Sequence, residues 1–476
     1  MLEAAHLAKT GLPAVAITGL TADSRAVTPG SLFAALPGVR ADGRAFIAEA
    51  VARGAAAILA PMGTPWPEGV PARPMIADAE PRRALALLAA AHAGAQPRTV
   101  IAITGTNGKT STAEFLRQLA PPPAASLGTL GVTAPGHPSG TGLTTPDPVS
   151  LAQTLARLAR EGVTVAAMEA SSHGLDQFRL DGVRLAAAGF TNLTRDHLDY
   201  HGTMAAYRTA KLRLFAALLP RGAPAIATAG LDRDTAVSLA TIARDRGLQL
   251  GFVGEDGDAI RLVRAVPHAG GQHLDLVVAG VPRTVELPLP GRFQADNALL
   301  AAALAEAVGM TGALDRLPTL TGVRGRMELA ATLPNGAAVY VDYAHTPDAL
   351  ERLLSALRPH TAGRLHVVFG AGGDRDSGKR PLMGDAAHRL ADTAIVTDDN
   401  PRGEDPAAIR AAILAACPGA RECADRAAAI DAALNGLAAG DVLVVAGKGH
   451  ESGQTVAGVT TPFDDAAVVR RLAGFA

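Results

Sequence analysis

One short glycine-rich segment carries residue types that bind phosphate. Val100 to Ile103 is an apolar run typical of a buried parallel strand, and Thr110 and Ser111 open a helical pattern. The turn between them consists of Gly105, Thr106, Asn107, Gly108 and Lys109. Backbone N–H groups and the helix dipole favour an anion at such a turn, and Lys109 adds a full positive charge. The segment therefore predicts a phosphate site.

The spacing of this segment is G-x-x-G-K-[ST]. It is shorter than the usual G-x-x-x-x-G-K-[ST], because Ile103 stands where the first glycine would be. The hydroxyl of Thr110 or Ser111 suits a phosphate-bound Mg²⁺. The alternative is a glycine-rich turn with a solvated lysine. The strand pattern before the turn and the helical pattern after it favour the phosphate site.

Two later strand ends supply further ionisable groups. Val163 to Met168 is a second buried-strand run, and it ends in Glu169, where a metal ligand beside a phosphate loop is expected. The run 186–190 leads into TNLTRDHLDYHG, which contains His197. A helix expected over 204–219 carries Lys211 on a largely apolar face. The alternatives are a surface histidine and a lysine that snorkels to solvent.

These residues require an α/β scaffold. The 476 residues suggest about three domains. We expect a small α/β N-terminal domain over 1–95, with a strand at 14–19 and a helix at 81–93. A central P-loop ATPase-like domain with a parallel sheet spans 96–321, and alternating runs within 221–290 predict a β-rich excursion with hairpins. The C-terminal domain spans 322–476.

Strand and helix patterns alternate in the C-terminal domain, which predicts a Rossmann-like, doubly wound parallel sheet. Strands are expected at 337–341, 366–369, 393–396 and 442–445. Polar residues follow each strand, where open α/β sheets bind ligands. GAGGDRD at Gly370 lacks the full G-x-G-x-x-G spacing, so an NAD site is only weakly indicated.

Composition narrows the class of protein. The formal net charge of -1 argues against a nucleic-acid or polybasic membrane surface. The N-terminus does not read as a signal peptide, and we expect no membrane span. Cys417 and Cys423 suggest neither a disulfide framework nor a zinc site. A reducing cytoplasm is the expected location.

The assembled loops resemble the Mur ligases of bacterial peptidoglycan synthesis over nearly the whole chain. A departure is Gln294, where the family usually has Asn, and we expect a minor effect. The motifs that carry the resemblance are DSR at Asp23, TGTNGKTS at Thr104, TTP at Thr144, MEASSHGLDQFR at Met168, FTNLTRDHLDYHG at Phe190, GRME at Gly325, VDYAHTPDAL at Val341, GAGGDRD at Gly370, TDDNPR at Thr397 and GKGHE at Gly447.

The resemblance implies an ATP-dependent amide ligase that acts through an acyl phosphate. Its implied substrates are UDP-N-acetylmuramoyl-L-alanyl-D-glutamate, whose D-glutamate side chain is activated, and meso-diaminopimelate, which supplies the amine. Its implied cofactors are ATP and Mg²⁺, and we expect a monomer. Cations must gather where a carboxylate meets ATP phosphates.

The resemblance also implies residue roles. Lys109 would hold the β- and γ-phosphates, Mg²⁺ would lie on Thr110 or Ser111 and on Glu169, and a second Mg²⁺ would lie on His197. Lys211 would be a carbamylated lysine that binds the second metal. The nucleotide would contact Asn297, Arg326 and Asp342, and the UDP-sugar dipeptide would contact Ser24, Thr144, Thr145, Ser171, Gln177 and Arg179.

The amino-acid site is expected in the C-terminal domain. Diaminopimelate differs from lysine by a carboxylate at its far end, which a guanidinium binds bidentately. Arg402 follows Asp399, Asn400 and Pro401 just beyond a strand tip, and family members that add diaminopimelate carry this DNPR sequence. Further contacts are expected from Arg375, Gly447 and Glu451. The alternative for Arg402 is a solvent-facing side chain after a turn.

Two other functions compete with this one. A folylpolyglutamate-type synthetase shares the P-loop and the ligase architecture, but the DSR-containing N-terminal domain and DNPR argue against it. A non-enzymatic P-loop switch would use nucleotide only to change shape. Glu169, His197 and Lys211, beside a separate amino-acid site, disfavour the switch.

Overall fold

The computed structural model describes residues 15–38, 41–137, 142–268 and 270–474. The chain divides into two compact units. The first consists of Met1–Lys109, Leu116–Gly251 and Leu304–Met310, and the second of Thr110–Phe115, Phe252–Ala303 and Thr311–Ala476. Of the helices in the described ranges, none is long and apolar enough to cross a membrane.

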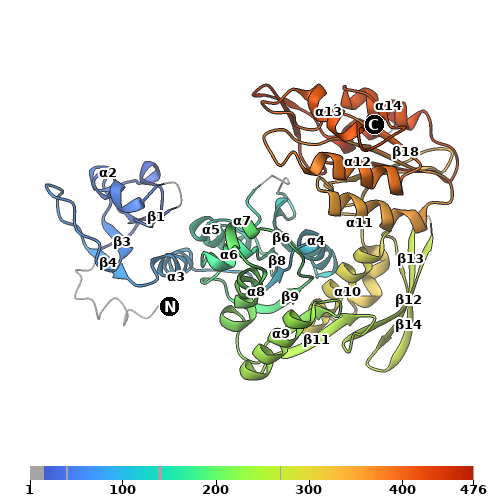
Figure 1. Cartoon of the computed structure of the whole chain (residues 1–476). Helices are drawn as coiled ribbons and strands as arrows, with labels where there is room; N and C mark the ends of the chain where they lie inside the picture. The colour runs from blue at the N-terminus through green and yellow to red at the C-terminus, as the bar shows by residue number, and fades with distance from the viewer. Residues whose placement is uncertain (1–14, 39–40, 138–141, 269, 475–476) are drawn as a thin grey trace. The chain divides into compact units, whose positions relative to one another are not determined.

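A small parallel sheet opens the first unit, with strand order β1-β2-β3-β4 (Figure 1). The strand expected at 14–19 is wrong in its bounds, because β1 begins at Gly19 and Ala14 lies outside the described residues. The helix expected at 81–93 is confirmed as α3. The elements are β1 (Gly19–Thr21), η1 (Ser24–Ala26), β2 (Ser31–Ala34), η2 (Gly43–Phe46), α2 (Ile47–Ala52), β3 (Ala57–Pro61), β4 (Met75–Asp78) and α3 (Pro81–Ala93).

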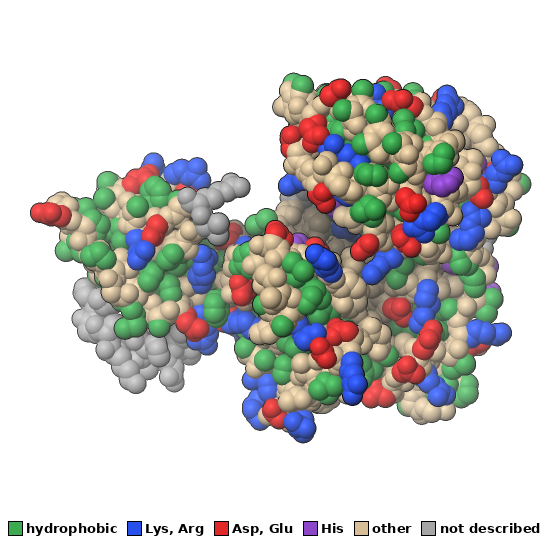
Figure 2. All heavy atoms as spheres, in the orientation of Figure 1, with side chains coloured by type: hydrophobic (Ala, Val, Ile, Leu, Met, Phe, Trp, Pro, Cys, Tyr) green, Lys and Arg blue, Asp and Glu red, His purple; other side chains and the backbone are tan. Residues whose placement is uncertain are grey.

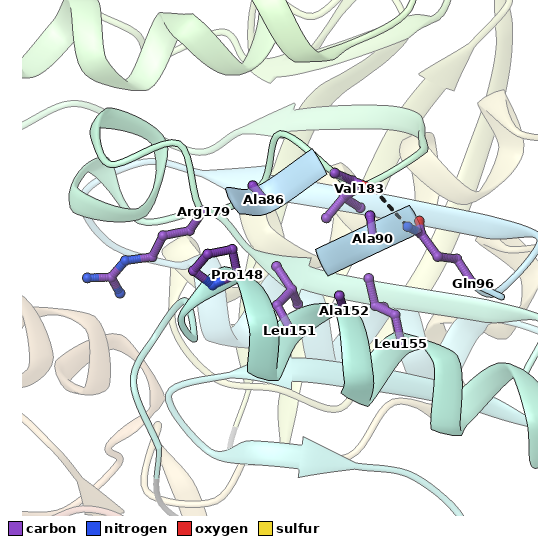
Figure 3. A pocket seen from close by; sticks show the side chains of 10 residues that line it. Ala86, Ala90, Gln96, Pro148, Leu151, Ala152, Leu155, Arg179 and Val183 are labelled. Carbon is purple, nitrogen blue, oxygen red and sulfur yellow. Dashed lines mark hydrogen bonds between the residues drawn. The ribbon is translucent and has the colours of Figure 1, made fainter. Parts of the chain in front are cut away.

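Helix α3 packs on α5 (Pro148–Arg160), and Ala86 and Ala90 of α3 line a small pocket together with Leu151 and Leu155 of α5 (Figure 3). A Cβ at Gly182 would overlap the backbone oxygen of Ala86, so the chain can approach α3 only because that position is glycine. Gln96 fastens the same region, since its Nε2 donates to the Gly182 carbonyl at 2.8 Å and its Oε1 accepts from the Arg184 N–H at 3.0 Å. The connection after α3 is therefore well anchored.

The larger sheet of the first unit has strand order β10-β9-β5-β8-β6-β7, parallel except for the β6–β7 pair. Its central strands β5 and β8 are apolar on both faces, as parallel strands covered by helices must be. The helix expected over 204–219 is α-helical to Arg213 and continues as a π-helix, η3. The elements are β5 (Thr99–Thr104), α4 (Lys109–Leu119), β6 (Ala124–Gly128), β7 (Gly131–Thr133), α5, β8 (Val165–Glu169), α6 (Ser172–Asp176), β9 (Leu185–Phe190), α7 (Leu198–His201), α8 (Met204–Arg213), η3 (Leu214–Leu218), β10 (Pro224–Thr228), α9 (Arg233–Arg246) and β11 (Gln249–Gly254).

The second unit contains the expected β-rich excursion, an antiparallel meander of β12, β13 and β14. Leu274 and Leu276 of its middle strand are buried, whereas His273 and Asp275 are more exposed, so the meander has one packed face and one solvent face. The elements of this part are β12 (Ile260–His268), β13 (Gly271–Val278), β14 (Val281–Leu287), α10 (Arg292–Ala307) and η4 (Leu314–Thr319).

The C-terminal sheet has strand order β15-β16-β20-β17-β18-β19. Alternate strand residues enter two cores: Tyr340 and Val367 pack with α11, α12 and α13, whereas Val341 and Val368 pack with α14 and α15. The doubly wound arrangement is thus confirmed, although β15 is antiparallel to β16. The elements are β15 (Glu328–Thr332), β16 (Ala338–Asp342), α11 (Pro347–Leu357), η5 (Arg358–His360), β17 (Leu365–Phe369), α12 (Lys379–Leu390), β18 (Thr393–Val396), α13 (Pro406–Leu414), β19 (Arg421–Glu422), α14 (Arg426–Leu434), β20 (Val442–Ala446), β21 (Gly453–Val456), β22 (Val459–Pro462) and α15 (Asp465–Leu472).

Acidic and basic side chains are interspersed on the surface seen in Figure 2. This agrees with 44 Lys and Arg against 45 Asp and Glu in the sequence. Specific recognition must therefore come from local groups of residues rather than from a field of one sign.

Candidate active site

The glycine-rich turn after β5 is held in shape by a distant segment. The N–H groups of Thr106 and Asn107 donate to the backbone and side-chain oxygens of Asn192, at 2.8 and 3.0 Å. Gly105 has φ +141°, and a Cβ there would overlap the Thr191 hydroxyl. The residue must therefore be glycine for the turn to lie against the loop after β9.

Two lysine side chains meet at this turn. Lys109, the first residue of α4, donates from Nζ to the carbonyls of Gly105 and Thr106 at 2.9 and 2.7 Å. Lys211, from α8, donates from Nζ to the same Gly105 carbonyl at 2.7 Å. Two amine groups therefore meet at a single carbonyl oxygen of the turn.

Lys211 does not snorkel, because only 1% of its surface is exposed. Its Nζ lies 4.5 Å from the centre of the Tyr207 ring, a weak substitute for an anion. Burial lowers the pKa of Lys211 well below its usual value, and the charge of Lys109 lowers it further. The side chain thus favours the neutral, nucleophilic amine.

Glu169 lies at the C-terminal tip of β8, beside the strand that leads into the turn. It is 2% exposed and pairs in register with Ile103 of β5. Its carboxylate accepts from the N–H of Thr129 at 2.7 Å and from the Thr129 hydroxyl at 3.3 Å. These contacts orient a buried carboxylate toward the edge of the sheet that carries the phosphate turn.

His197 belongs to a cluster of aromatic rings around His173. The His173 ring lies 4.9 Å from His197, 4.1 Å from Tyr200 and 5.5 Å from His201, measured between centres. Burial lowers the pKa of His173, with smaller effects from His197 and His201. His197 itself has a left-handed backbone with φ 51°, and its Nε2 lies 3.5 Å from Asp196 Oδ2. The neutral imidazole that a metal requires is therefore favoured at His173.

Five of the predicted dipeptide-binding residues occupy one region. Thr145 Oγ1 donates to the Glu169 carbonyl and accepts from the Ser171 N–H, both at 3.0 Å. The guanidinium of Arg179 donates to the Thr145 carbonyl at 2.6 Å and to Gln177 Oε1 at 2.7 Å. The fifth residue, Thr144, contacts Thr129 Oγ1 at 3.1 Å through its hydroxyl. Ser24 lies in a separate network of the small sheet, where its hydroxyl donates to Glu49 at 3.0 Å.

The predicted nucleotide residues Asn297, Arg326 and Asp342 lie in the second unit. Asp342 accepts from the N–H groups of Met327 and Ala344 at 2.7 and 2.8 Å. Burial raises its pKa, and Arg326 opposes that effect. The Arg326 guanidinium stacks over the Tyr343 ring at 4.6 Å.

Gln294 connects two of these groups. Its Nε2 donates to the Arg326 carbonyl, and its Oε1 accepts from Asn297 Nδ2, both at 3.3 Å. It is 1% exposed. Gln294, which replaces the usual family residue, therefore connects the predicted nucleotide residues Asn297, at the start of α10, and Arg326, in the GRME loop.

Asn400 is the centre of the predicted amino-acid site. Its Nδ2 donates to Glu451 Oε2 at 2.8 Å and to Asp399 Oδ1 at 3.1 Å. Its Oδ1 accepts from Lys448 Nζ at 3.1 Å and from the Thr455 N–H at 2.9 Å. Glu451 is thereby fixed beside the tip of β18.

Arg402 does not project freely into solvent. Its Nη1 donates to the Gly373 carbonyl at 2.7 Å, and its backbone is left-handed with φ 53°. That conformation is uncommon outside glycine and is maintained here by pairing with the β21 segment. Pro401 before it is buried, whereas Arg375 of the same GAGGDRD loop is exposed.

Gly447 allows β20 to end against Asp399. It has φ +119°, and a Cβ there would overlap Asp399 Oδ2. That oxygen is buried, and no hydrogen bond to it is found within the described residues. A buried carboxylate oxygen without a donor is suited to an ammonium group.

Family models match three consecutive parts of the chain. They are the Mur ligase family, catalytic domain, over residues 16–93, the Mur ligase middle domain over 103–305, and the Mur ligase, glutamate ligase domain, over 325–449. A Caulobacter vibrioides protein named UDP-N-acetylmuramoyl-L-alanyl-D-glutamate–2,6-diaminopimelate ligase is 57% identical over 462 residues, which cover 95% of this chain and 94% of the relative. The chain belongs to the Mur ligase family.

Other Mur ligases agree with this assignment. A Rhizobium meliloti protein of the same printed name is 54% identical and covers 97% of this chain and 95% of its own. A solved structure of that name has a TM-score of 0.72 at 34% identity, over 96% of this chain and 95% of its own. The predicted three-part α/β fold class is confirmed.

The fold alone does not separate Mur ligases from one competing class. A folylpolyglutamate synthase of Mycobacterium tuberculosis has a TM-score of 0.64 at 21% identity and covers 83% of this chain and 95% of its own. That likeness concerns the fold only. The distinction depends on the full-length identity to the diaminopimelate ligases and on the family match over residues 16–93.

The sequence placed two further residues of this Mur ligase in polar loops but assigned them no role. Lys448 stands within GKGHE and is 0% exposed, with Glu451 Oε2 3.5 Å from its Nζ. Asn192 accepts a hydrogen bond from the N–H of Asn107 in the phosphate turn, although the two residues are 85 positions apart in the sequence. The position of Lys448 just after an apolar strand could be read from the sequence, but the contacts of Lys448 and Asn192 with distant residues could not, because local patterns do not reveal them.

Proposed function

We propose that this Mur ligase joins meso-diaminopimelate to the D-glutamate side chain of UDP-N-acetylmuramoyl-L-alanyl-D-glutamate at the expense of ATP, in cytoplasmic peptidoglycan precursor synthesis. The observation that carries the proposal is the convergence of Lys109 and Lys211 on the Gly105 carbonyl, in a phosphate turn beside Glu169. Relatives of more than half identity bear the name of this ligase.

The reaction has two steps. A carboxylate oxygen of D-glutamate attacks the γ-phosphorus of ATP, and the bond to ADP breaks. The amine of diaminopimelate then attacks the acyl carbon, loses a proton, and expels inorganic phosphate. Lys109 offsets phosphate charge in the first step, because the reactants are anions that repel each other.

The donor groups fit Mg²⁺, which prefers oxygen ligands. Thr110, Ser111 and Glu169 would hold one ion, and His197 would contribute to a second. When bound, Mg²⁺ neutralises phosphate and carboxylate charge where the two substrates meet.

Lys211 would supply a further oxygen ligand after reaction with CO₂. Its neutral amine attacks the carbon of CO₂, and loss of a proton leaves an N-carboxylate. The burial of Lys211 and the neighbouring charge of Lys109 both support this step, since both favour the free amine. The product turns an amine into an anion beside Lys109.

The remaining residues would bind and orient the substrates. Asn297, Arg326 and Asp342 would hold the adenine, ribose or phosphate of ATP. The UDP-sugar and its dipeptide would contact Ser24, Thr144, Thr145, Ser171, Gln177 and Arg179. The domain roles would be UDP-sugar binding for 1–95, ATP binding and ligation for 96–321, and amino-acid binding for 322–476.

Diaminopimelate would be selected by its second carboxylate. Arg402 would pair with that carboxylate, Glu451 and the Asp399 oxygen would receive the adjacent ammonium, and Arg375 would bind the other carboxylate. Asn400, Pro401 and Gly447 would shape the pocket. Lysine would leave Arg402 without its anion, and sites built around a polar partner reject such analogues by about 10⁴-fold.

The test is an ADP-release assay with ATP, the UDP-muramoyl dipeptide and either amino acid. We expect the wild type to prefer diaminopimelate strongly, and Arg402→Ala to lose most of that preference in the ratio of kcat/KM. Arg389→Ala serves as a matched control, because this exposed arginine of the neighbouring helix α12 pairs with Asp385 and Glu351.

Equal use of lysine by the wild type, or an unchanged ratio in Arg402→Ala, would contradict the assignment of the amino acid. Ligation of glutamate to a folate would favour the folylpolyglutamate class. Nucleotide binding without ADP release, with all three substrates present, would favour a switch.

A further inference from the structure

Three side chains on the β12–β14 meander form a compact group of potential metal ligands. His268 ends β12, His273 lies in β13, and Glu286 lies in β14. Their nearest ligand atoms all lie within 4.8 Å of one another. None of the three is among the residues assigned above to substrate, nucleotide or Mg²⁺.

Strand register places the three on one face. His273 is directly opposite Glu286 on β14 and opposite Val266 on β12, and His268 follows Val266 by two positions. Directly paired and diagonal residues of antiparallel strands share a face and can touch. Leu274 points to the other, packed face, so the histidines and the glutamate converge on the solvent side.

The atoms are already oriented toward a shared centre. His268 Nε2 lies 2.7 Å from Glu286 Oε1, and His273 Nδ1 contacts Glu286 Oε2 more closely. The two imidazole rings are 4.8 Å apart between centres and inclined by 36°. Glu286 Oε2 is buried, and within the described residues it has no contact of hydrogen-bond geometry. The closest nitrogen–oxygen pair therefore lacks the geometry of a hydrogen bond.

We propose that His268 Nε2, His273 Nδ1 and the Glu286 carboxylate bind a divalent transition-metal ion of the zinc class, with solvent completing the coordination. Two imidazoles and one carboxylate are a donor set typical of Zn²⁺, whereas Mg²⁺ prefers oxygen ligands. The ion and a proton compete for each ligating nitrogen, so binding weakens as the pH falls.

Binding requires one local change. The Gly270 N–H donates to His268 Nδ1 at 3.2 Å, which places the imidazole proton on Nε2. A metal at Nε2 moves that proton to Nδ1, and the Gly270 N–H must then turn away. The contact is long and exposed, so its loss costs little compared with two nitrogen–metal bonds.

The site is tied to the segment before α10. The His268 carbonyl accepts from His360 Nδ1 at 2.9 Å, and His360 Nε2 accepts from the Gly291 N–H at 2.9 Å. Buried Gln272, next to His273, donates to the carbonyls of Leu289 and Gly291 at 2.8 and 2.9 Å. An ion that fixes His268 therefore stabilises the whole group of contacts, and bound zinc raises the melting temperature.

The experiment is a Zn²⁺ titration of the full-length protein against a colorimetric chelator, with Mg²⁺ in large excess to occupy oxygen-rich sites. We expect the wild type to bind one Zn²⁺ more tightly than His273→Gln or Glu286→Gln, by at least tenfold. His137→Gln is the matched control, because His137 also faces a glutamate, Glu161 at 2.6 Å, but without a second histidine.

Two further readouts make the result decisive. Co²⁺ in the wild type should give the visible absorption of a low-symmetry nitrogen–oxygen site, and His268→Gln should abolish it. The melting temperature without zinc should be the same in all variants, which shows that they fold, and zinc should raise it only in the wild type and His137→Gln. The proposal is wrong if the wild type and Glu286→Gln bind zinc with equal affinity, or if His137→Gln loses as much zinc affinity as the variants of the site. The three side chains would then form only a hydrogen-bonded His–Glu–His cluster.

Discussion

Of the lysines that the structure describes, two are almost completely buried, and their surroundings differ. Lys211 is 1% exposed and donates to the Gly105 carbonyl, which Lys109 also contacts. Within the described residues, Lys211 has no carboxylate at ion-pair distance. Lys448 is 0% exposed and contacts Asn400 Oδ1 and the Glu451 carboxylate. The buried amine of Lys211 therefore has no anionic partner in the described part of the chain, whereas that of Lys448 has the Glu451 carboxylate.

This difference distinguishes two uses of a buried lysine. A buried charge without a counterion is costly, so Lys211 favours its neutral form and becomes reactive. A buried ammonium with a carboxylate and an amide oxygen instead fixes the geometry of those groups. We therefore expect Lys211 to take part in the chemistry and Lys448 to position the amino-acid site.

The largest effect is expected at Lys211. Lys211→Ala should reduce kcat by about 10³-fold or more, since removal of an electrostatic element of a phosphoryl-transfer site has effects of this size. Lys211→Arg keeps a cation but cannot form a carbamate, and it should be equally impaired. The measurement is ADP release, with short carboxylic acids added to replace the missing anion. A fully active Lys211→Arg would mean that only positive charge is needed.

A smaller effect is expected at Lys448. Lys448→Met keeps the volume but frees Asn400 and Glu451, so KM for diaminopimelate should rise about tenfold or more, as for a lost charged hydrogen bond. KM for ATP and kcat at saturating amino acid should change little. Steady-state kinetics with each substrate varied in turn gives these KM values and kcat separately. Equal changes in the KM values of all three substrates would indicate general unfolding instead of a positioning role.

The loop of Lys448 also contains a histidine that should be sensitive to pH. Burial, together with the positive charges of Arg326 and Arg324, lowers the pKa of His450 to about 4. The unfolded imidazole gains its proton near pH 6.5 and the folded one only near pH 4, so stability falls as the pH drops through this window. The loss should be roughly 2 kcal/mol after allowance for partial hydration.

The check for His450 is denaturant unfolding between about pH 7 and 4.5. His450→Gln should flatten this part of the pH profile, because the amide does not titrate. Asn435→Gln, remote from the loop, is a control that should keep the wild-type slope. A slope in His450→Gln equal to that of the wild type would assign the titration to other groups.

The smallest effect is expected at Gln294. Gln294→Asn restores the usual family residue but shortens the side chain that connects Asn297 with the Arg326 carbonyl. KM for ATP should change less than about threefold, the effect of one weak neutral hydrogen bond. Gln294→Leu should have a larger effect, because it leaves buried polar groups without partners. If Gln294→Asn proved as damaging as Gln294→Leu, the shorter amide could not take over these contacts.

Local patterns were sufficient for much of this fold. The runs at 100–103 and 163–168 were expected as buried strands, and they form neighbouring parallel strands with Glu169 at the edge. The helix expected at 81–93 occurs with those bounds, because a proline starts it. The sequence alone therefore places the residues that follow these apolar strands at the edge of the sheet formed by the carboxyl ends of the strands.

Other features depend on contacts between distant residues. The strand β15 was not among the expected strands, and its antiparallel pairing with β16 is set by tertiary contacts. The left-handed backbone of Arg402 depends on the β21 segment some fifty residues later. The unpaired state of Lys211 is a property of its whole surroundings, so the sequence left both a snorkelling and a carbamylated lysine open.

The most direct test is the ¹³C NMR spectrum of the full-length protein equilibrated with ¹³C-labelled bicarbonate. We predict a protein-bound carbamate signal in the wild type and in Lys448→Met, and its loss in Lys211→Arg. The signal should weaken under acid, which protonates the amine and releases CO₂. A wild-type spectrum without a carbamate, or a signal that persists in Lys211→Arg, would contradict the assignment of Lys211 as the reactive, unpaired lysine.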